Sequence, residues 1–121
     1  MGIVCPDRRQ ADALLSLFGR RVAREHFVTT YHALCIFTDE GPPCIELVVP
    51  DGGTLASFNR GVGGIHHIAY EVEDLDAVSR RLRDGGVELL EKTPIDAGPI
   101  RINFLPPSST RGLIVELIEP K

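Results

Sequence analysis

A chain of 121 residues with 43% hydrophobic and 25% charged residues has the size and composition of one soluble globular domain. Its net charge is −4 and its basic residues are scattered, which excludes the concentrated basic surface of a nucleic-acid-binding protein. No apolar run approaches the roughly 18 residues that span a bilayer, and no signal-like segment opens the chain. We therefore expect no nucleic-acid or membrane partner, a cytoplasmic location, and reduced thiols at Cys5, Cys35 and Cys44.

The hydrophobic pattern predicts two helices placed between strands. The first helix covers about residues 7–17 and the second about residues 74–84, each with apolar residues at helical spacing on one side. Each begins at an aspartate suited to N-capping and is followed by a glycine suited to ending a helix. A short strand is expected before the first helix. Further strands are predicted at residues 22–28, 31–38, 44–49, 65–72, 87–91, 100–105 and 113–118.

Two stretches of the chain resemble one another, which indicates an internal duplication. CIELVVP (44–50) and IVELIEP (114–120) both contain Glu-Leu, with a proline four residues after the glutamate. GIVCPDRRQADALLSLFG and AYEVEDLDAVSRRLRDGG both read as a strand, a capping aspartate and a helix. We predict an α+β fold in a single domain, residues 1–121. It would contain two tandem βαβββ modules, 1–50 and 65–121, joined by the turn-rich linker 51–64.

Alternation along the strands predicts which side chains face away from the helices. His67 falls on the less apolar face of its strand, so we expect it to face a cleft while His66 lies at the sheet margin. Glu116 lies on the opposite face from the leucines of its strand, and a buried carboxylate is costly unless it is paired or metal-bound. If the more apolar alternate set of 100–105 packs under the helix, Arg101 and Asn103 face the cleft as well.

At these residues the chain resembles the vicinal oxygen chelate superfamily, which includes glyoxalase I, bleomycin-resistance proteins and extradiol dioxygenases. GGIHHIAYEVEDLDA and FLPPSSTRGLIVELIE are similar to the second module of its methylmalonyl-CoA epimerase branch. The resemblance covers the whole chain and is stronger from Gly63 onward. It implies a glyoxalase-like fold, in which curled mixed sheets surround a central cleft with a divalent metal ion, and it favours a homodimer.

The resemblance also implies a set of metal ligands. His67, the second histidine of HHIA, and Glu116 of VEL match ligands of the family, while Glu46 of IEL holds the matching place in the first module. Imidazole and carboxylate ligands suit Mn, Co, Ni, Zn or Fe(II). The alternative is a structural strand histidine and two glutamates in surface ion pairs.

The repeat also predicts a ligand that the sequence does not contain. The first-module counterpart of His67 would stand immediately ahead of Met1. Either the start of the chain is trimmed or misassigned, or the site has three of the family's four ligands. With three ligands, the metal would bind weakly or not at all.

A second departure concerns the acid/base residue of the epimerase branch. Matching without gaps places Thr30 where that branch has a glutamate, and threonine cannot remove a carbon-bound proton at neutral pH. By alternation, His32 is the titratable cleft-facing side chain nearby, so we predict that it replaces the base if any residue does. The alternative is a structural histidine. Pro107 and Ser108 stand where the branch has basic loop residues. The predicted substrate-binding residues are Thr30, Arg101, Asn103, Ser108 and Arg111.

The resemblance favours a metal-dependent epimerase or isomerase that moves the proton beside the carbonyl of a 2-substituted acyl thioester. Glu116, as ligand and base, and His32 are the predicted catalytic residues. The expected partner is a small molecule, either a coenzyme A thioester or a glutathione adduct. A glyoxalase I-like lyase is one alternative, and a non-catalytic small-molecule-binding protein is another. An Fe(II) dioxygenase would need the absent histidine.

Overall fold

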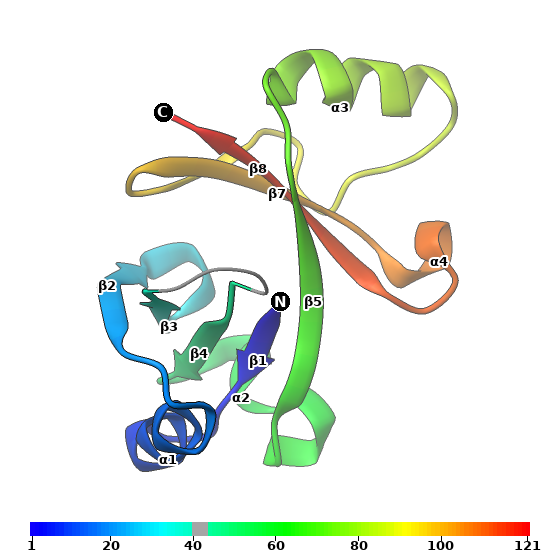
Figure 1. Ribbon diagram of the computed structural model, residues 1–121. Helices are drawn as coiled ribbons and strands as arrows, with labels where there is room; N and C mark the ends of the chain where they lie inside the picture. Colours follow the sequence, from blue (N-terminus) through cyan, green and yellow to red (C-terminus); the bar gives the residue numbers. More distant parts are fainter. Residues whose placement is uncertain (40–43) are drawn as a thin grey trace. The chain divides into compact units, whose positions relative to one another are not determined.

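The computed structural model describes residues 1–39 and 44–121. Its two longer helices begin after Asp7 and Asp74 and end at Gly19 and Gly85. Contacts divide the chain into two compact units, Met1–His66 and His67–Lys121. The elements of the first unit are β1 (Gly2–Val4), α1 (Arg8–Phe18), β2 (Val22–Val28), β3 (Ala33–Thr38) and β4 (Glu46–Pro50) (Figure 1). Its strands are ordered β2-β3-β4-β1, with β1 parallel to β4 and the other pairs antiparallel.

Helix α1 forms because both of its ends are capped and one of its sides is apolar. The side chain of Asp7 accepts a hydrogen bond from the backbone N–H of Gln10, and Gly19 ends the helix with φ 65°, in the left-handed region. Ala11 and Leu15 lie in the buried core of the first unit. The same core contains Ile3, Cys5, Ile36, Ile45 and Leu47.

The second unit repeats the arrangement of the first. Strand β5 (Gly64–Glu71) leads into α3 (Leu75–Asp84), which is followed by β6 (Ile95–Ala97), β7 (Ile100–Leu105) and β8 (Ile114–Pro120). The strand order is β5-β8-β7-β6, with β5 parallel to β8. Leu75 of α3 packs with Val115 and Leu117 of β8 in a second apolar core.

Short helical segments fill the connections. They are a 3₁₀ turn at Thr29–Tyr31, α2 (Gly53–Ala56), a second 3₁₀ turn at Phe58–Gly61 and α4 (Pro107–Thr110). Gly63 closes the segment between β4 and β5 with φ 80°, and a Cβ atom at this position would stand 2.2 Å from the carbonyl oxygen of Val4. Only glycine fits this close approach.

Strand registers confirm the predicted duplication. In the first unit Glu46 pairs with Gly2 on one side and with Phe37 on the other. In the second unit Glu116 pairs with Ala69 and Phe104 in the same way. The α+β class and the βαβββ order of both modules are therefore confirmed.

The three cysteines are free, with Cys5 and Cys35 buried and Cys44 exposed.

Two strand predictions were wrong. Residues 87–91 form no strand, because this segment is held by the neighbouring β7 in a different way: Leu90 N–H donates to the carbonyl of Phe104, and Asn103 binds the backbone of Glu91 with its side chain. The predicted strand at 31–38 begins only at Ala33, because Thr29–Tyr31 is a 3₁₀ turn.

Among the described residues, no helix is both long and apolar enough to span a membrane.

Candidate metal centre

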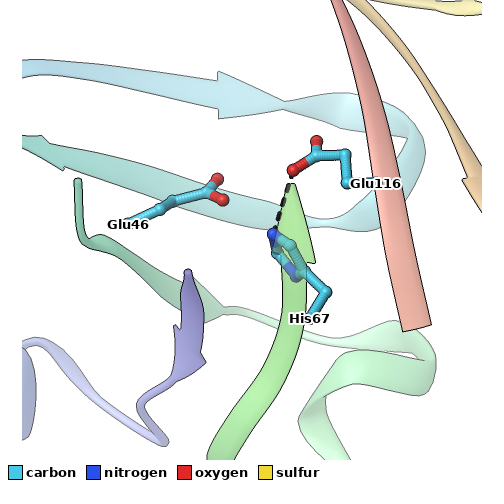
Figure 2. Close-up of side chains that lie close together, drawn as sticks. All are labelled: Glu46, His67 and Glu116. Atoms are coloured by element: carbon cyan, nitrogen blue, oxygen red, sulfur yellow. Dashed lines mark ion pairs between the residues drawn. The ribbon is translucent and has the colours of Figure 1, made fainter. Parts of the chain in front are cut away.

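His67 and Glu116 form a buried pair on neighbouring parallel strands. His67 pairs in register with Ile114 and Ala69 pairs with Glu116, so the two side chains are diagonal neighbours on one face of the sheet. His67 Nε2 lies 3.0 Å from Glu116 Oε2. Figure 2 marks this ion pair with a dashed line. The residues are 4% and 5% exposed, respectively. The predicted proximity of these two side chains is thus observed.

An aromatic ring adjoins the pair. Phe104 pairs in register with Glu116, and its ring meets the imidazole of His67 edge-on with centroids 6.0 Å apart. An imidazole and a carboxylate buried in such surroundings are costly to hold for stability alone, since apolar residues of similar volume often do as well or better. Buried ionisable side chains of this kind are candidates for a functional site.

Glu46 holds the position in the first unit that Glu116 holds in the second. It is half-buried and belongs to the face of its sheet opposite α1, because its neighbour Leu47 packs into the core beneath that helix. His67 and Glu116 of the second unit, and Glu46 at the matching position of the first, are side chains of the types that could hold a metal ion (Figure 2). Two carboxylates and one imidazole suit a hard to borderline divalent cation.

The strand registers also bear on the ligand that is missing from the repeat. Gly2 pairs with Glu46 as Ala69 pairs with Glu116. The counterpart of His67 therefore falls two residues before Gly2, immediately ahead of Met1, where the spacing of the repeat had placed it.

The face predicted for Arg101 and Asn103 was wrong. Arg101 donates hydrogen bonds to Glu119 and to Asp76 of α3, and the bond to Glu119 is the main reason that its pKa is raised. Asn103 is 0% exposed and binds the backbone N–H and C=O of Glu91. The other face of β7 carries Phe104, the neighbour of His67. Either alternate set of side chains on β7 could pack under a helix, so residue composition alone did not distinguish the two faces.

The alternation used for Thr30 and His32 was also wrong. Alternation from His32 would turn Leu34 and Ile36 away from α1 as well. Ile36 instead lies in the core with α1, and Thr30 belongs to the 3₁₀ turn. His32 follows that turn in the left-handed region with φ 51°, which removes it from the strand's alternation. Its side chain is 62% exposed, and Nδ1 lies 3.8 Å from a carboxylate oxygen of Asp51. Both residues therefore lie outside the regular alternation of β3 (Ala33–Thr38).

The remaining predicted substrate-binding residues lie on the connection between β7 and β8. Ser108 is exposed within α4, and Arg111 is exposed at the end of that helix with φ 65°. Their predicted role remains a prediction. The sequence suggests that Arg24 is one of several basic residues on a solvated face or at a phosphate, and it assigns no role to His26. Both residues share the face of β2 that lies opposite α1. A register irregularity between Val22 and Arg24 shifts the alternation there, and nothing in the sequence signals it.

The match to known families agrees with this architecture. Residues 1–104 match the family described as the Glyoxalase/Bleomycin resistance protein/Dioxygenase superfamily. The chain belongs to this superfamily, as the resemblance of its two modules predicted.

The individual relatives narrow the assignment. The chain is 40% identical over 79 residues to an ethylmalonyl-CoA/methylmalonyl-CoA epimerase of Cereibacter sphaeroides; the match covers 60% of this chain and 59% of the relative, less than two thirds of its length. It is 32% identical over 130 residues to the mitochondrial methylmalonyl-CoA epimerase of Dictyostelium discoideum, covering 98% of this chain and 75% of the relative. The crystal structure of a methylmalonyl-CoA epimerase from Mycobacterium tuberculosis matches with a TM-score of 0.88 and 29% identity, over 99% of this chain and 85% of that one. These relatives support the epimerase-like branch of the superfamily.

Proposed function

We propose that this chain is a metal-dependent epimerase of 2-substituted acyl-CoA thioesters, with methylmalonyl-CoA as the first substrate to test. The observation that carries the proposal is the buried pair of His67 and Glu116, with Nε2 and Oε2 3.0 Å apart, in a chain whose relatives are epimerases. The substrate class comes from the names of those relatives.

In this proposal Glu46 joins His67 and Glu116 as a ligand. Its support is the duplication, because Glu46 and Glu116 have the same partners in register within their own units. The donor set fits Co²⁺, Mn²⁺, Ni²⁺, Zn²⁺ or Fe²⁺. When bound, such an ion supplies Lewis-acid stabilisation of the negative charge that develops on the thioester oxygen.

The chain's own groups carry the proton transfer. We assign Glu116 as the base: its carboxylate takes the proton from C2 of the substrate, and the electron pair of the broken C–H bond moves toward the thioester carbonyl. A solvent-derived proton delivered to the other face of C2 gives the opposite epimer, and the proton held by Glu116 is released to solvent. Phe104, whose ring meets His67, limits water around the developing charge.

The test is α-proton exchange. The chain, freed of metal with a chelator and then supplied with Co²⁺ or Mn²⁺, is incubated with one epimer of methylmalonyl-CoA in D₂O. We expect metal-dependent formation of the other epimer with deuterium at C2, measured by NMR. The Glu116→Gln variant should be slower by about 100-fold or more. Absence of exchange in the metal-supplied wild type would refute the proposed activity, and undiminished exchange in Glu116→Gln would refute the role of Glu116.

The same experiment separates the epimerase from a non-catalytic binding protein. A binding protein would take up the thioester without exchanging its α-proton. Calorimetric titration with methylmalonyl-CoA, run beside the exchange assay, distinguishes binding without chemistry from the absence of any interaction.

A further inference from the structure

Arg24 lies in one register row with the proposed ligand Glu46. Arg24 on β2 pairs with Phe37 on β3, and Phe37 pairs with Glu46 on β4. Directly paired residues on neighbouring strands project their side chains from the same face of a sheet. The next residue, Glu25, projects from the other face and forms an ion pair with Arg8 of α1. Arg24, Phe37 and Glu46 therefore share the face opposite α1.

The guanidinium of Arg24 is oriented but incompletely satisfied. Its Cζ lies 3.7 Å from the centre of the Phe37 ring, a stacking contact that fixes the direction of the planar group. Within the described part of the chain, Nη1 is buried and has no hydrogen-bond partner. A guanidinium is always charged, so a buried N–H without an acceptor is destabilising. Such a group is expected where a ligand supplies the acceptor.

The position of the guanidinium limits which part of a ligand it can reach. The guanidinium lies over the ring of Phe37, and Phe37 pairs directly with Glu46 on the neighbouring strand. Neighbouring strands lie roughly 4.8 Å apart. A substrate held at the proposed ligand Glu46 would bring only the groups nearest that ligand within reach of Arg24. The fork of N–H groups on a guanidinium matches the two oxygens of a carboxylate.

We propose that Arg24 is a substrate-binding residue that receives the free carboxylate of a 2-carboxyacyl thioester. This inference rests on the proposed function and specifies its substrate class: the reacting carbon carries both the thioester carbonyl and a carboxylate. Arg24 then selects these substrates over neutral acyl thioesters of the same size. The methylmalonyl group has this chemistry.

The test compares Arg24→Gln with Arg9→Gln, which removes the same charge from an exposed position on α1. Initial rates are measured with methylmalonyl-CoA and with the methylmalonyl thioester of N-acetylcysteamine, which keeps the carboxylate but has no phosphate. We expect KM to rise about 10- to 100-fold in Arg24→Gln with both substrates, as loss of a charge-assisted hydrogen bond predicts, and to stay unchanged in Arg9→Gln. The KM of Arg24→Lys should fall between those of the wild type and Arg24→Gln.

Thermal unfolding separates recognition from a structural role. Because Arg24→Gln removes a charged group with a buried, unsatisfied N–H, its Tm should equal or exceed that of the wild type. A lower Tm, together with a fall in kcat as large as the rise in KM, would overturn the proposal. So would an unchanged KM, or an effect seen with the coenzyme A thioester alone, which would assign Arg24 to a phosphate.

Failure of the proposed function itself would be recognised separately. If the wild type exchanges no α-proton, binding of racemic methylmalonyl-CoA is measured by calorimetry, since a racemic mixture undergoes no net epimerisation. A weaker affinity in Arg24→Gln than in Arg9→Gln would still support the carboxylate site. Equal affinities would overturn it.

Discussion

The imidazole of His67 and the carboxylate of Glu116 lie 3.0 Å apart on adjacent parallel strands, and both are almost fully buried. As an isolated ion pair this arrangement adds little to stability, because the cost of removing both groups from water offsets their attraction. As part of a ligand set, the same arrangement places two donors where a cation can bind both. The two interpretations predict different behaviour when the pair is replaced.

Replacement of the whole pair tests whether it is retained for function. We expect the double variant His67→Phe, Glu116→Leu to unfold in metal-free buffer with a stability equal to that of the wild type or up to about 4 kcal/mol higher. The single variant Glu116→Leu, which leaves His67 without this partner, should lose about 3 kcal/mol or more. Urea unfolding followed by circular dichroism measures all three. A double variant less stable than the single one would show that the pair is structural.

His32 should be dispensable for catalysis. It is exposed, it lies beyond a 3₁₀ turn, and its ring nitrogen lies 3.8 Å from an Asp51 oxygen. We expect His32→Asn, which tolerates the left-handed backbone at this position, to keep kcat within about threefold of the wild type. A fall in kcat of tenfold or more at an unchanged Tm would restore His32 as the second acid/base.

Gly63 should be irreplaceable for a steric reason that can be isolated. An added Cβ would stand 2.2 Å from the Val4 carbonyl oxygen, whereas at Gly61, with a similar φ of 82°, the nearest atom is 3.8 Å away. Gly61→Ala should therefore cost only the left-handed backbone strain of about 1–2 kcal/mol. Gly63→Ala should cost roughly 2 kcal/mol more through the clash. Equal losses in urea unfolding would show that the backbone at Val4 yields freely.

Thiol reactivity should follow burial and pH. Burial, followed by the charge of Asp7, raises the pKa of the Cys5 thiol, so its reactive thiolate forms only at higher pH than in an unfolded chain. Cys44 is exposed. Native alkylation near neutral pH should modify Cys44 first and Cys5 only slowly, as peptide mass spectrometry can show, while all three thiols react in denaturant. Rapid native labelling of Cys5 would contradict its burial.

The duplication and the central pair could be predicted because they depend on repeated local patterns. Both glutamates sit in the same short motif, and the alternation around His67 holds through an unbroken strand. Some of the failures occurred where the backbone departs from regular strand geometry. His32 has a left-handed conformation, and β2 shifts register between Val22 and Arg24. Neither feature has a distinct signature in residue types.

Asn103 shows a different limit of sequence reasoning. A polar residue in an apolar strand was assigned to the cleft, yet its amide is buried and satisfied by the backbone of Glu91 and Phe104. A side-chain amide can replace a missing ladder in this way, because it offers both donors and an acceptor. Only the three-dimensional arrangement reveals that such partners exist.

Metal binding to the isolated chain decides whether His67 and Glu116 are metal ligands. Chelator-treated wild type and Glu116→Gln are titrated with Co²⁺, with heat, visible absorption and Tm recorded together. We expect saturation at one Co²⁺ per chain with a rise in Tm for the wild type, and an affinity at least about tenfold weaker for the variant. A wild type that shows no saturable binding and no change in Tm, or a variant that binds Co²⁺ equally well, would contradict it.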